Sequence, residues 1–284
     1  MINAEHEKWD LQIKPATGWL DINFKEIWRY RDLVALLVKR DWESMFKQTI
    51  LGPFWAVGQP LLMAVIFTFV FGKMVNISTE GVSPHIFYLC GLLPWNLFSL
   101  SFTKISNTLT SNASIFGKVY FPRLVVPLSY LISGLISFTI NLGVFLVFVV
   151  ISILSGHSYQ INSFILLVPF LLILLLLFSL GLGLILAALT IKYKDLAFLS
   201  TFGLQLFMYA TPIIYPLSSV SGEYRMLLEM NPLSSIVEGF RYAILGVGNI
   251  SLGNLLYSTC IIVGLFTIGL LIFNKSEKSF IDTV

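Results

Sequence analysis

The chain has 284 residues, of which 56% are hydrophobic and 12% are charged, and its mean hydropathy is +0.84. Soluble domains carry about 45–50% apolar and about 25% charged residues, so this composition excludes a soluble domain and predicts that lipid covers most of the surface. The net charge of +3 is too small to indicate a nucleic-acid partner, and no basic stripe alternates with aromatic residues. Cys90 and Cys260 lie in apolar runs and read as small hydrophobic residues.

The apolar segments predict six membrane spans. The first apolar block begins near Ile50, too late for a secretory signal peptide, so we expect the N-terminus to be mature sequence. A membrane helix needs about 20 apolar residues, and the uncharged stretch 124–191 is therefore too long for one crossing. The polar run 155–160 divides it. The predicted spans are 52–75, 84–106, 124–154, 163–191, 196–216 and 251–273.

The basic residues orient these spans. If both termini are cytoplasmic, fifteen Lys and Arg residues fall inside and three fall outside, namely Lys73, Arg225 and Arg241. This distribution follows the positive-inside rule. The sequence thus predicts an all-α multi-pass membrane protein with both termini in the cytoplasm.

Three further segments fit neither a span nor a simple loop. Residues 24–38 predict an amphipathic helix at the membrane interface, with a soluble helix packed on a partner as the alternative. The inner loop 112–123 is too polar for lipid and too short for a domain. The charges and prolines of 217–250 favour two short helices that dip partway into the membrane from outside. The apolar face of the first segment contains Phe24, Ile27, Trp28, Val34, Ala35 and Val38.

An internal energy source is missing from the sequence. Gly117 and Lys118 lack the earlier glycine and the hydroxyl residue of an ATP-binding loop. The spans lack the buried acidic and arginine residues that proton-coupled carriers use as relays. If this protein moves a substrate, we expect the energy to come from a partner.

Catalytic and metal-binding patterns are also missing. His6, His85 and His157 are far apart and show no metal-ligand spacing, so we expect no metal site. Asp195 and Glu223 stand alone, whereas an enzyme of this kind would show paired catalytic groups. Gly181 and Gly183 lack the third glycine of a dinucleotide motif and predict close helix packing instead.

Several strings go beyond composition, and together they resemble ABC-type permeases that export polysaccharides. The similarity covers roughly residues 25–284, and the loop that ends in KVYFPR at Arg123 is its most specific part. The strings are 48–55 (QTILGPFW) with Gln59 and Pro60, 91–95 (GLLPW) with Phe98, 112–123, Lys194 and Asp195, 211–216 (TPIIYP), 231–233 (NPL) with Arg241 and Gly246, and 280–284 (FIDTV).

This resemblance implies a function and partners. In the family, two permease copies pair with two copies of an ATP-binding subunit and move an undecaprenyl-diphosphate-linked glycan across the bacterial inner membrane. The glycan is an O-antigen, a capsule or a wall teichoic acid. ATP and magnesium bind the partner subunit, so we expect no cofactor on this chain. The implied organisation is a cytoplasmic segment 1–49, a transmembrane domain 50–274 with coupling loop 107–123 and outer gate segment 217–250, and a cytoplasmic tail 275–284.

The inner loop is the expected contact with the ATPase, because a short rigid element transmits a rigid-body movement. A plain connector is the alternative. The expected coupling residues are Asn112, Ile115, Phe116, Lys118 and Tyr120.

A lipid diphosphate needs cations near the headgroup plane. Arg31, Lys39, Arg40 and Lys47 precede the first span closely and are the expected binding residues. The same residues also orient the protein and contact anionic lipids, which is the alternative interpretation.

A glycan path needs aromatic rings with polar groups nearby. Trp95, Phe98 and Phe102 share one face of the second span, and Tyr209 and Tyr215 lie near the outer half of the fifth. The alternative is that these rings only pack, face lipid or mark the interface.

The outer segment offers a charged pair for the exit. Glu238 and Arg241 are three residues apart on one predicted helix, and they either close the exit or only hold the segment together. For the chain as a whole, the rival functions are an exporter of a small drug or lipid, a membrane-bound polysaccharide-processing enzyme, and a scaffold or channel.

Overall fold

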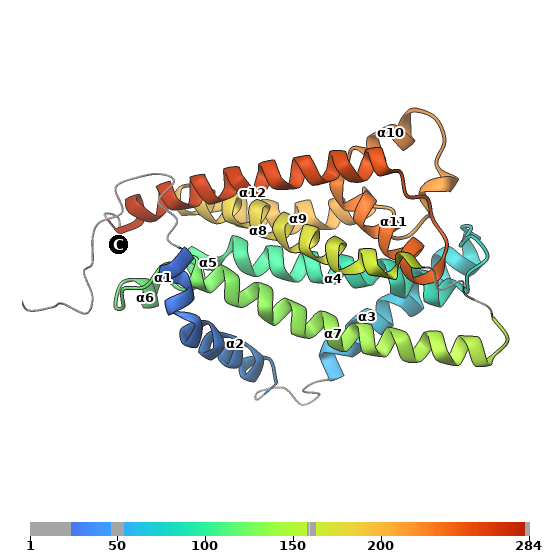
Figure 1. Ribbon diagram of the computed structural model, residues 1–284, viewed down its shortest axis with the longest axis horizontal. Helices are drawn as coiled ribbons and strands as arrows, with labels where there is room; N and C mark the ends of the chain where they lie inside the picture. The colour runs from blue at the N-terminus through green and yellow to red at the C-terminus, as the bar shows by residue number, and fades with distance from the viewer. Residues whose placement is uncertain (1–23, 47–53, 158, 160–162, 282–284) are drawn as a thin grey trace, which may run out of the picture.

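The computed structural model describes residues 24–46, 54–157, 159 and 163–281, and the long helices run side by side as one bundle (Figure 1). Every regular element in these residues is a helix, so the predicted all-α class is confirmed. The first described helix and the end of the last one lie at the same end of the bundle, on the left in Figure 1.

Five helices in the described residues are long and apolar enough to cross a membrane, and the chain is a multi-pass membrane protein. They correspond to five of the six predicted spans. The candidate spans are Val57–Met74, Pro84–Ser106, Val125–Leu154, Phe164–Lys192 and Leu252–Ser276.

The expected span 196–216 differs from these five. It forms α9 (Asp195–Tyr209), a helix of 15 residues, whereas a crossing needs about 20. The helix ends three residues before Pro212, which lacks the N–H that a continuing helix needs. The remaining residues, 210–216, are irregular and pack against α11 (Pro232–Leu245).

α4 (Pro84–Ser106) is the central helix of the bundle. It packs against α3 (Phe54–Phe67), α7 (Val125–Leu154), α8 (Val168–Lys192) and α11. Most of its residues are buried, although they are no more apolar than those of the outer spans. Burial of α4 is therefore decided by its position among other helices.

Small residues let α8 approach its neighbours closely. A Cβ on Gly181 would lie 2.7 Å from the backbone of Phe266 in α12 (Leu252–Ile281), and one on Gly183 would lie 2.6 Å from Ile105 of α4. The prediction that these two glycines mark a helix-packing site is confirmed. Close backbone approach compensates for the weak driving force between apolar helices in lipid.

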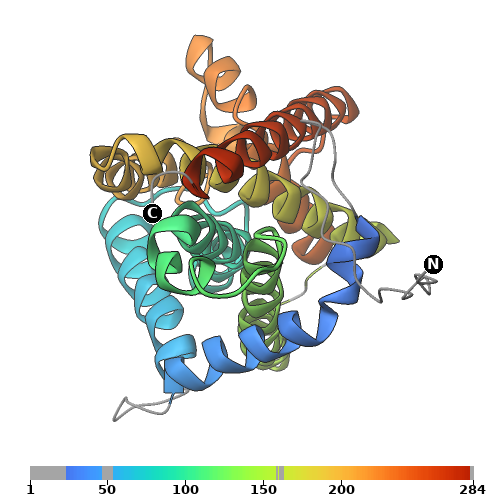
Figure 2. The same cartoon turned by 90° about the vertical axis from the view of Figure 1, so that its left-hand side faces the viewer.

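The expected amphipathic helix is broken at Tyr30 into α1 (Phe24–Arg29) and α2 (Arg31–Phe46). Figure 2, which views the bundle from its left end, shows both helices along one side of it. Leu37 is buried against the start of α7, whereas Trp28 is 70% exposed. Of the predicted apolar face, Val34 packs with Leu37 against the start of α7.

Short elements occupy the two ends of the bundle. At the left end of Figure 1, α5 (Thr108–Ser111) and α6 (Ala113–Phe116) form the loop between α4 and α7. At the right end, the two expected short helices are present as α10 (Glu223–Glu229) and α11. Three tighter or wider turns complete the fold: a π-helical turn Thr68–Met74 and 3₁₀ turns Ser163–Leu167 and Leu217–Ser219.

Candidate functional site

The predicted coupling residues divide into an anchored group and an exposed group. Asn112 is 4% exposed, and its side-chain amide donates to the carbonyl of Thr108 at 2.9 Å. Phe116 is half-buried, and its ring centroid lies 5.6 Å from that of Phe121. Lys118 and Tyr120 are exposed. Ile115 belongs to the anchored group, because it is half-buried against the cluster that contains Leu37.

Four polar side chains tie this loop to three helices. Lys104 of α4 donates to Asp41 of α2 at 2.7 Å, and its ammonium lies 5.9 Å from the ring centroid of Tyr130 in α7. The amide of Asn112 donates to the hydroxyl of Tyr130 at 3.1 Å. We call Asp41, Lys104, Tyr130 and Asn112 the loop network. Its contacts join the loop, α2, α4 and α7.

The loop network was missed by the sequence reasoning. In the sequence, Lys104 is one of the fifteen basic residues that orient the chain in the membrane. Asp41 lies 63 positions away in a basic segment. No local spacing connects these residues, so only the tertiary packing reveals the pair.

The cations proposed for a lipid diphosphate lie on α2. Arg31, Lys39 and Arg40 are exposed, while Lys47 lies outside the described residues. Arg31 approaches Asp32 at 3.8 Å, but both side chains are more than half exposed, so this pair adds little stability. The three described cations point away from the bundle core and remain predicted contacts for an anionic group.

The predicted canal aromatics of α4 are inside the bundle. Trp95, Phe98 and Phe102 are 6%, 1% and 7% exposed. Phe98 stacks on Phe178 of α8 with ring centroids 5.1 Å apart and also contacts Phe207 of α9. In this arrangement these rings hold α4, α8 and α9 together, and their role in a glycan path stays a prediction.

The two predicted canal tyrosines lie at the end of α9. Tyr209 is 61% exposed, and the hydroxyl of Tyr215 donates to its carbonyl at 2.9 Å. That bond folds 210–216 back over the end of the helix. Of the five predicted aromatics, Tyr209 alone has a largely exposed ring.

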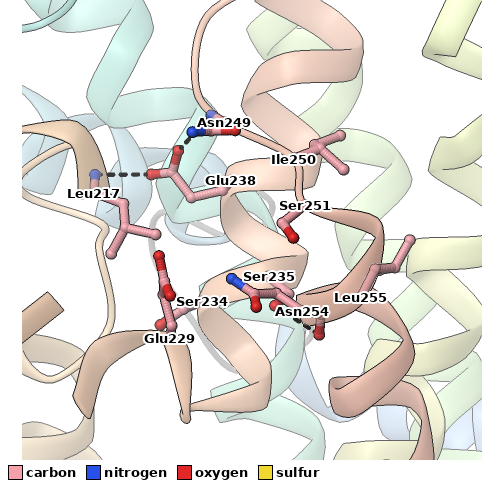
Figure 3. Close-up of a pocket in the computed structure, with 10 residues that line it drawn as sticks. All are labelled: Leu217, Glu229, Ser234, Ser235, Glu238, Asn249, Ile250, Ser251, Asn254 and Leu255. Atoms are coloured by element: carbon pink, nitrogen blue, oxygen red, sulfur yellow. Dashed lines mark hydrogen bonds between the residues drawn. The ribbon is translucent and has the colours of Figure 1, made fainter. Parts of the chain in front are cut away.

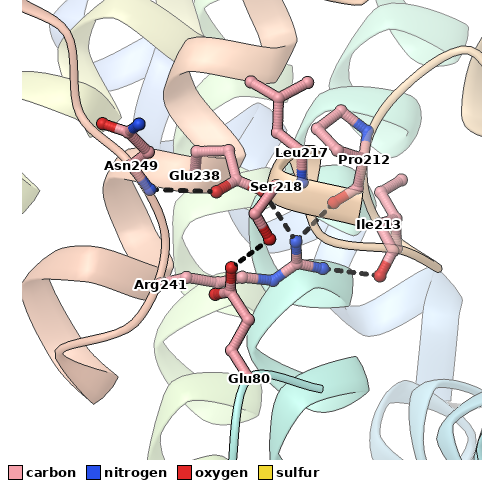
Figure 4. Close-up of polar contacts among 8 residues, drawn as sticks. All are labelled: Glu80, Pro212, Ile213, Leu217, Ser218, Glu238, Arg241 and Asn249. Carbon is pink, nitrogen blue, oxygen red and sulfur yellow. Dashed lines mark hydrogen bonds and ion pairs between the residues drawn. The ribbon is translucent and has the colours of Figure 1, made fainter. Parts of the chain in front are cut away.

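The predicted pair of the outer segment is present and fully buried. The guanidinium of Arg241 donates to Glu238 at 3.1 Å, to the carbonyl of Ile213 at 2.6 Å and to the carbonyl of Pro212 (Figure 4). Its charge centre also lies 3.9 Å from the ring centroid of Phe87 in α4. Arg241 is 0% exposed, and its contacts join α11, α4 and the segment after α9.

Glu238 links further segments of the chain. Its carboxylate accepts hydrogen bonds from the backbone N–H of Leu217 at 3.3 Å and of Asn249 at 3.4 Å. Burial raises the pKa of Glu238, and the positive charge of Arg241 together with these N–H donors opposes that rise. We call Glu238, Arg241 and their partners the buried network.

The buried network depends on a glycine and extends to the surface. A Cβ on Gly91 of α4 would lie 2.7 Å from a terminal nitrogen of Arg241, so any larger residue would require the guanidinium or the helix to move. Ser218 donates to the carboxylate of Glu80, whose positive φ of 53° lies in a turn before α4 (Figure 4). Sequence reasoning identified the ion pair but not these supporting residues.

A small polar cavity lies beside the buried network (Figure 3). Its volume of about 20 Å³ matches a single water molecule and excludes a sugar ring. The hydroxyl of Ser234, 1% exposed, lines it without a protein partner. Within the described residues, no three His, Cys, Asp or Glu side chains are grouped as metal ligands.

Comparison with known proteins identifies the family. The sequence profile described as ABC-2 type transporter matches residues 32–245, which is three quarters of the chain and includes the loop network and the ion pair of Glu238 and Arg241. The chain belongs to this family. It is a membrane-embedded transport component and not an enzyme, and permeases of this family pair with ATP-binding subunits.

Curated relatives cover most of the chain. The O-antigen export system permease protein RfbA of Klebsiella pneumoniae is 29% identical over 88% of this chain and 94% of its own length. The polysialic acid transport protein KpsM of Escherichia coli is 27% identical over 88% and 95%. The inner membrane transport permease YadH of Escherichia coli K12 is 25% identical over 68% and 77%.

Proposed function

We propose that this permease moves an undecaprenyl-diphosphate-linked polysaccharide of the O-antigen, capsule or teichoic-acid type across the bacterial inner membrane. Two of the similar relatives carry names that specify O-antigen export and polysialic acid transport, and the similarity extends over 88% of the chain. The match to YadH, whose name specifies no substrate, leaves a small drug or lipid as the alternative cargo.

Energy enters through the loop formed by α5 and α6. The observation that supports this most directly is the loop network, which bonds the buried Asn112 to Tyr130 while Lys118 and Tyr120 stay exposed. An ATP-binding subunit that contacts the exposed residues would move the anchored ones as a unit. A flexible connector would absorb the same movement.

The loop faces the cytoplasm in this proposal, and both termini lie on that side. The first described helix and the end of α12 lie at the same end of the bundle as the loop, which supports that orientation (Figure 1). The excess of Lys and Arg in the corresponding segments supports it as well. Two permease copies form the pathway, with Arg31, Lys39 and Arg40 near the lipid diphosphate and the buried network at the exit.

The decisive experiment deletes the gene and fractionates the long-chain glycans of the cell by location and lipid attachment. We expect lipid-linked polymer to accumulate on the cytoplasmic side, because synthesis continues while export stops. Complementation by the wild-type gene is the control. Unchanged surface glycan, in a strain without a second exporter, would contradict the proposal and favour a small-molecule cargo.

A further inference from the structure

An apolar cavity of about 300 Å³ lies between α4, α8 and α9. Its lining is almost entirely hydrocarbon and aromatic, and the hydroxyl of Ser200 is already bonded to the carbonyl of Ala197 at 2.7 Å. A lining without free hydrogen-bonding groups suits an apolar occupant and disfavours a sugar. The lining residues used below are Phe98, Phe102, Leu186, Leu196, Gly203 and Phe207.

The volume fits part of one lipid chain. A methylene group fills about as much space as a water molecule, roughly 30 Å³, so the cavity accommodates about ten carbons. The side of α9 that turns away from the bundle is also apolar, with Phe198 86% and Phe202 57% exposed. Only Met208 of α9 is buried, and the helix is therefore held mainly by the walls of this cavity.

The turn that joins α8 to α9 carries two cations close in sequence to the lining residues. Leu186 and Leu196 line it on either side of the turn that joins α8 to α9, where Lys192 and Lys194 are exposed. Lys192 is six residues from Leu186, a helical rise of about 9 Å. The candidate span ends at Lys192, which places the turn at a membrane surface. With the exposed Asp195, the turn keeps one net positive charge.

We propose that this cavity binds one acyl chain of an anionic membrane phospholipid whose headgroup contacts Lys192 and Lys194. The apolar walls, a volume that fits part of one chain and the cations of the adjoining turn at headgroup level together fit this ligand. The bound chain would brace α9, the short helix that leads to the segment held by Arg241. This site does not depend on which substrate the permease carries.

The test uses the purified full-length chain with equal amounts of phosphatidylglycerol and phosphatidylcholine that carry the same acyl chains. Native mass spectrometry counts the lipids that remain bound. We expect phosphatidylglycerol to be retained preferentially. The double variant Lys192→Gln/Lys194→Gln should lose that preference by about fivefold for each lysine removed, while the apolar cavity still holds a chain.

Gly203→Leu tests the cavity itself. A Cβ at Gly203 meets nothing within 4 Å, so a side chain can begin there without displacing a neighbour. We expect several-fold less retained lipid of both kinds. The matched control is Gly264→Leu on α12, where the same exchange also meets open space, and its lipid retention should equal that of the wild type.

Four outcomes would overturn the proposal. Wild-type retention by Gly203→Leu would remove the cavity as the site, and equal retention of both lipids by the unmodified chain would remove the headgroup contact. Loss of dimer with unchanged lipid in Gly203→Leu would assign the cavity to a second copy of the chain. Displacement of phosphatidylglycerol by equimolar undecaprenyl phosphate would assign it to an isoprenoid carrier.

Discussion

The two polar networks at opposite ends of the bundle differ mainly in their exposure to solvent. In the loop network, the side chains of Lys104 and Asp41 are 25% and 19% exposed. One contact joins each pair of neighbouring elements in it. In the buried network, Arg241 and Glu238 are 0% and 2% exposed and each makes several bonds. Partial exposure permits rearrangement, whereas complete burial makes every lost bond expensive.

The largest expected effect comes from breaking the buried network. Arg241→Met would leave the carbonyls of Pro212 and Ile213 without this donor and the buried carboxylate of Glu238 without its cation. Loss of one partner of a buried ion pair costs about 3–5 kcal/mol. We expect thermal unfolding of the detergent-purified chain at a much lower temperature than the wild type.

The variant Arg225→Met is the control for Arg241→Met, because the pair of Arg225 with Glu229 is partly exposed. Equal unfolding temperatures for Arg241→Met and the wild type would contradict the importance of the buried network. Reversing the pair, with Glu238→Arg and Arg241→Glu together, should not restore stability, since a carboxylate cannot donate to the two carbonyls.

A smaller effect is expected from crowding the same network. Gly91→Ala would place a Cβ 2.7 Å from Arg241 and 3.3 Å from the carbonyl of Ile213. Overpacking of this kind costs about 1–3 kcal/mol, measured again by thermal unfolding. Gly143→Ala on α7 meets open space and should be no less stable than the wild type. Identical melting of the two variants would show that the guanidinium tolerates a different position.

A substitution in the loop between α4 and α7 should lower transport-coupled ATP hydrolysis and hardly change the free energy of unfolding. Lys118→Glu changes an exposed residue, so the free energy of unfolding should stay within about 0.5 kcal/mol of the wild type. If Lys118 contacts the ATPase, transport-coupled ATP hydrolysis should fall about tenfold, as for a central interface residue. Lys73→Glu, an exposed lysine at the other end, is the control. Normal coupled hydrolysis in Lys118→Glu would contradict the assignment.

Phe116→Ala sharpens this test. The ring of Phe116 contacts Phe121 and lies 5.5 Å from the guanidinium of Arg123, so its loss should change the shape of the loop. We expect reduced coupling together with a small loss of stability. A reduction in stability alone would make Phe116 a packing residue only.

A modest effect on stability is expected from the loop network itself. Asp41→Asn removes one charge of a partly exposed pair, which costs at most about 1 kcal/mol. We nevertheless expect less substrate moved per ATP hydrolysed, because Lys104 loses its link to α2. The exchanged pair Asp41→Lys/Lys104→Asp should recover part of the coupling. Full coupling in Asp41→Asn would show that the network only holds the helices together.

The sequence predicts the bundle well because membrane insertion depends on local properties. Length, apolar composition and the absence of charges define five of the six spans within a few residues of the observed helices. The ion pair of Glu238 and Arg241 was also predictable, since residues three apart on a helix face the same side. The proline-rich strings around Pro212 and Pro232 likewise indicated the short helices of the outer segment.

Other features depend on which helices meet, and no local pattern contains that information. The contacts of Lys104 with Asp41 and of Arg241 with the carbonyl of Ile213 join residues that are 63 and 28 positions apart. The burial of Trp95, Phe98 and Phe102 follows from the central position of α4, and the same aromatic face on an outer helix would contact lipid. The sequence by itself determined the membrane setting, the helices and the need for an external energy source. Only the tertiary structure decided which side chains are buried, which are paired and where α9 leaves a cavity, because hydrogen bonds and packing act between atoms brought together by the fold.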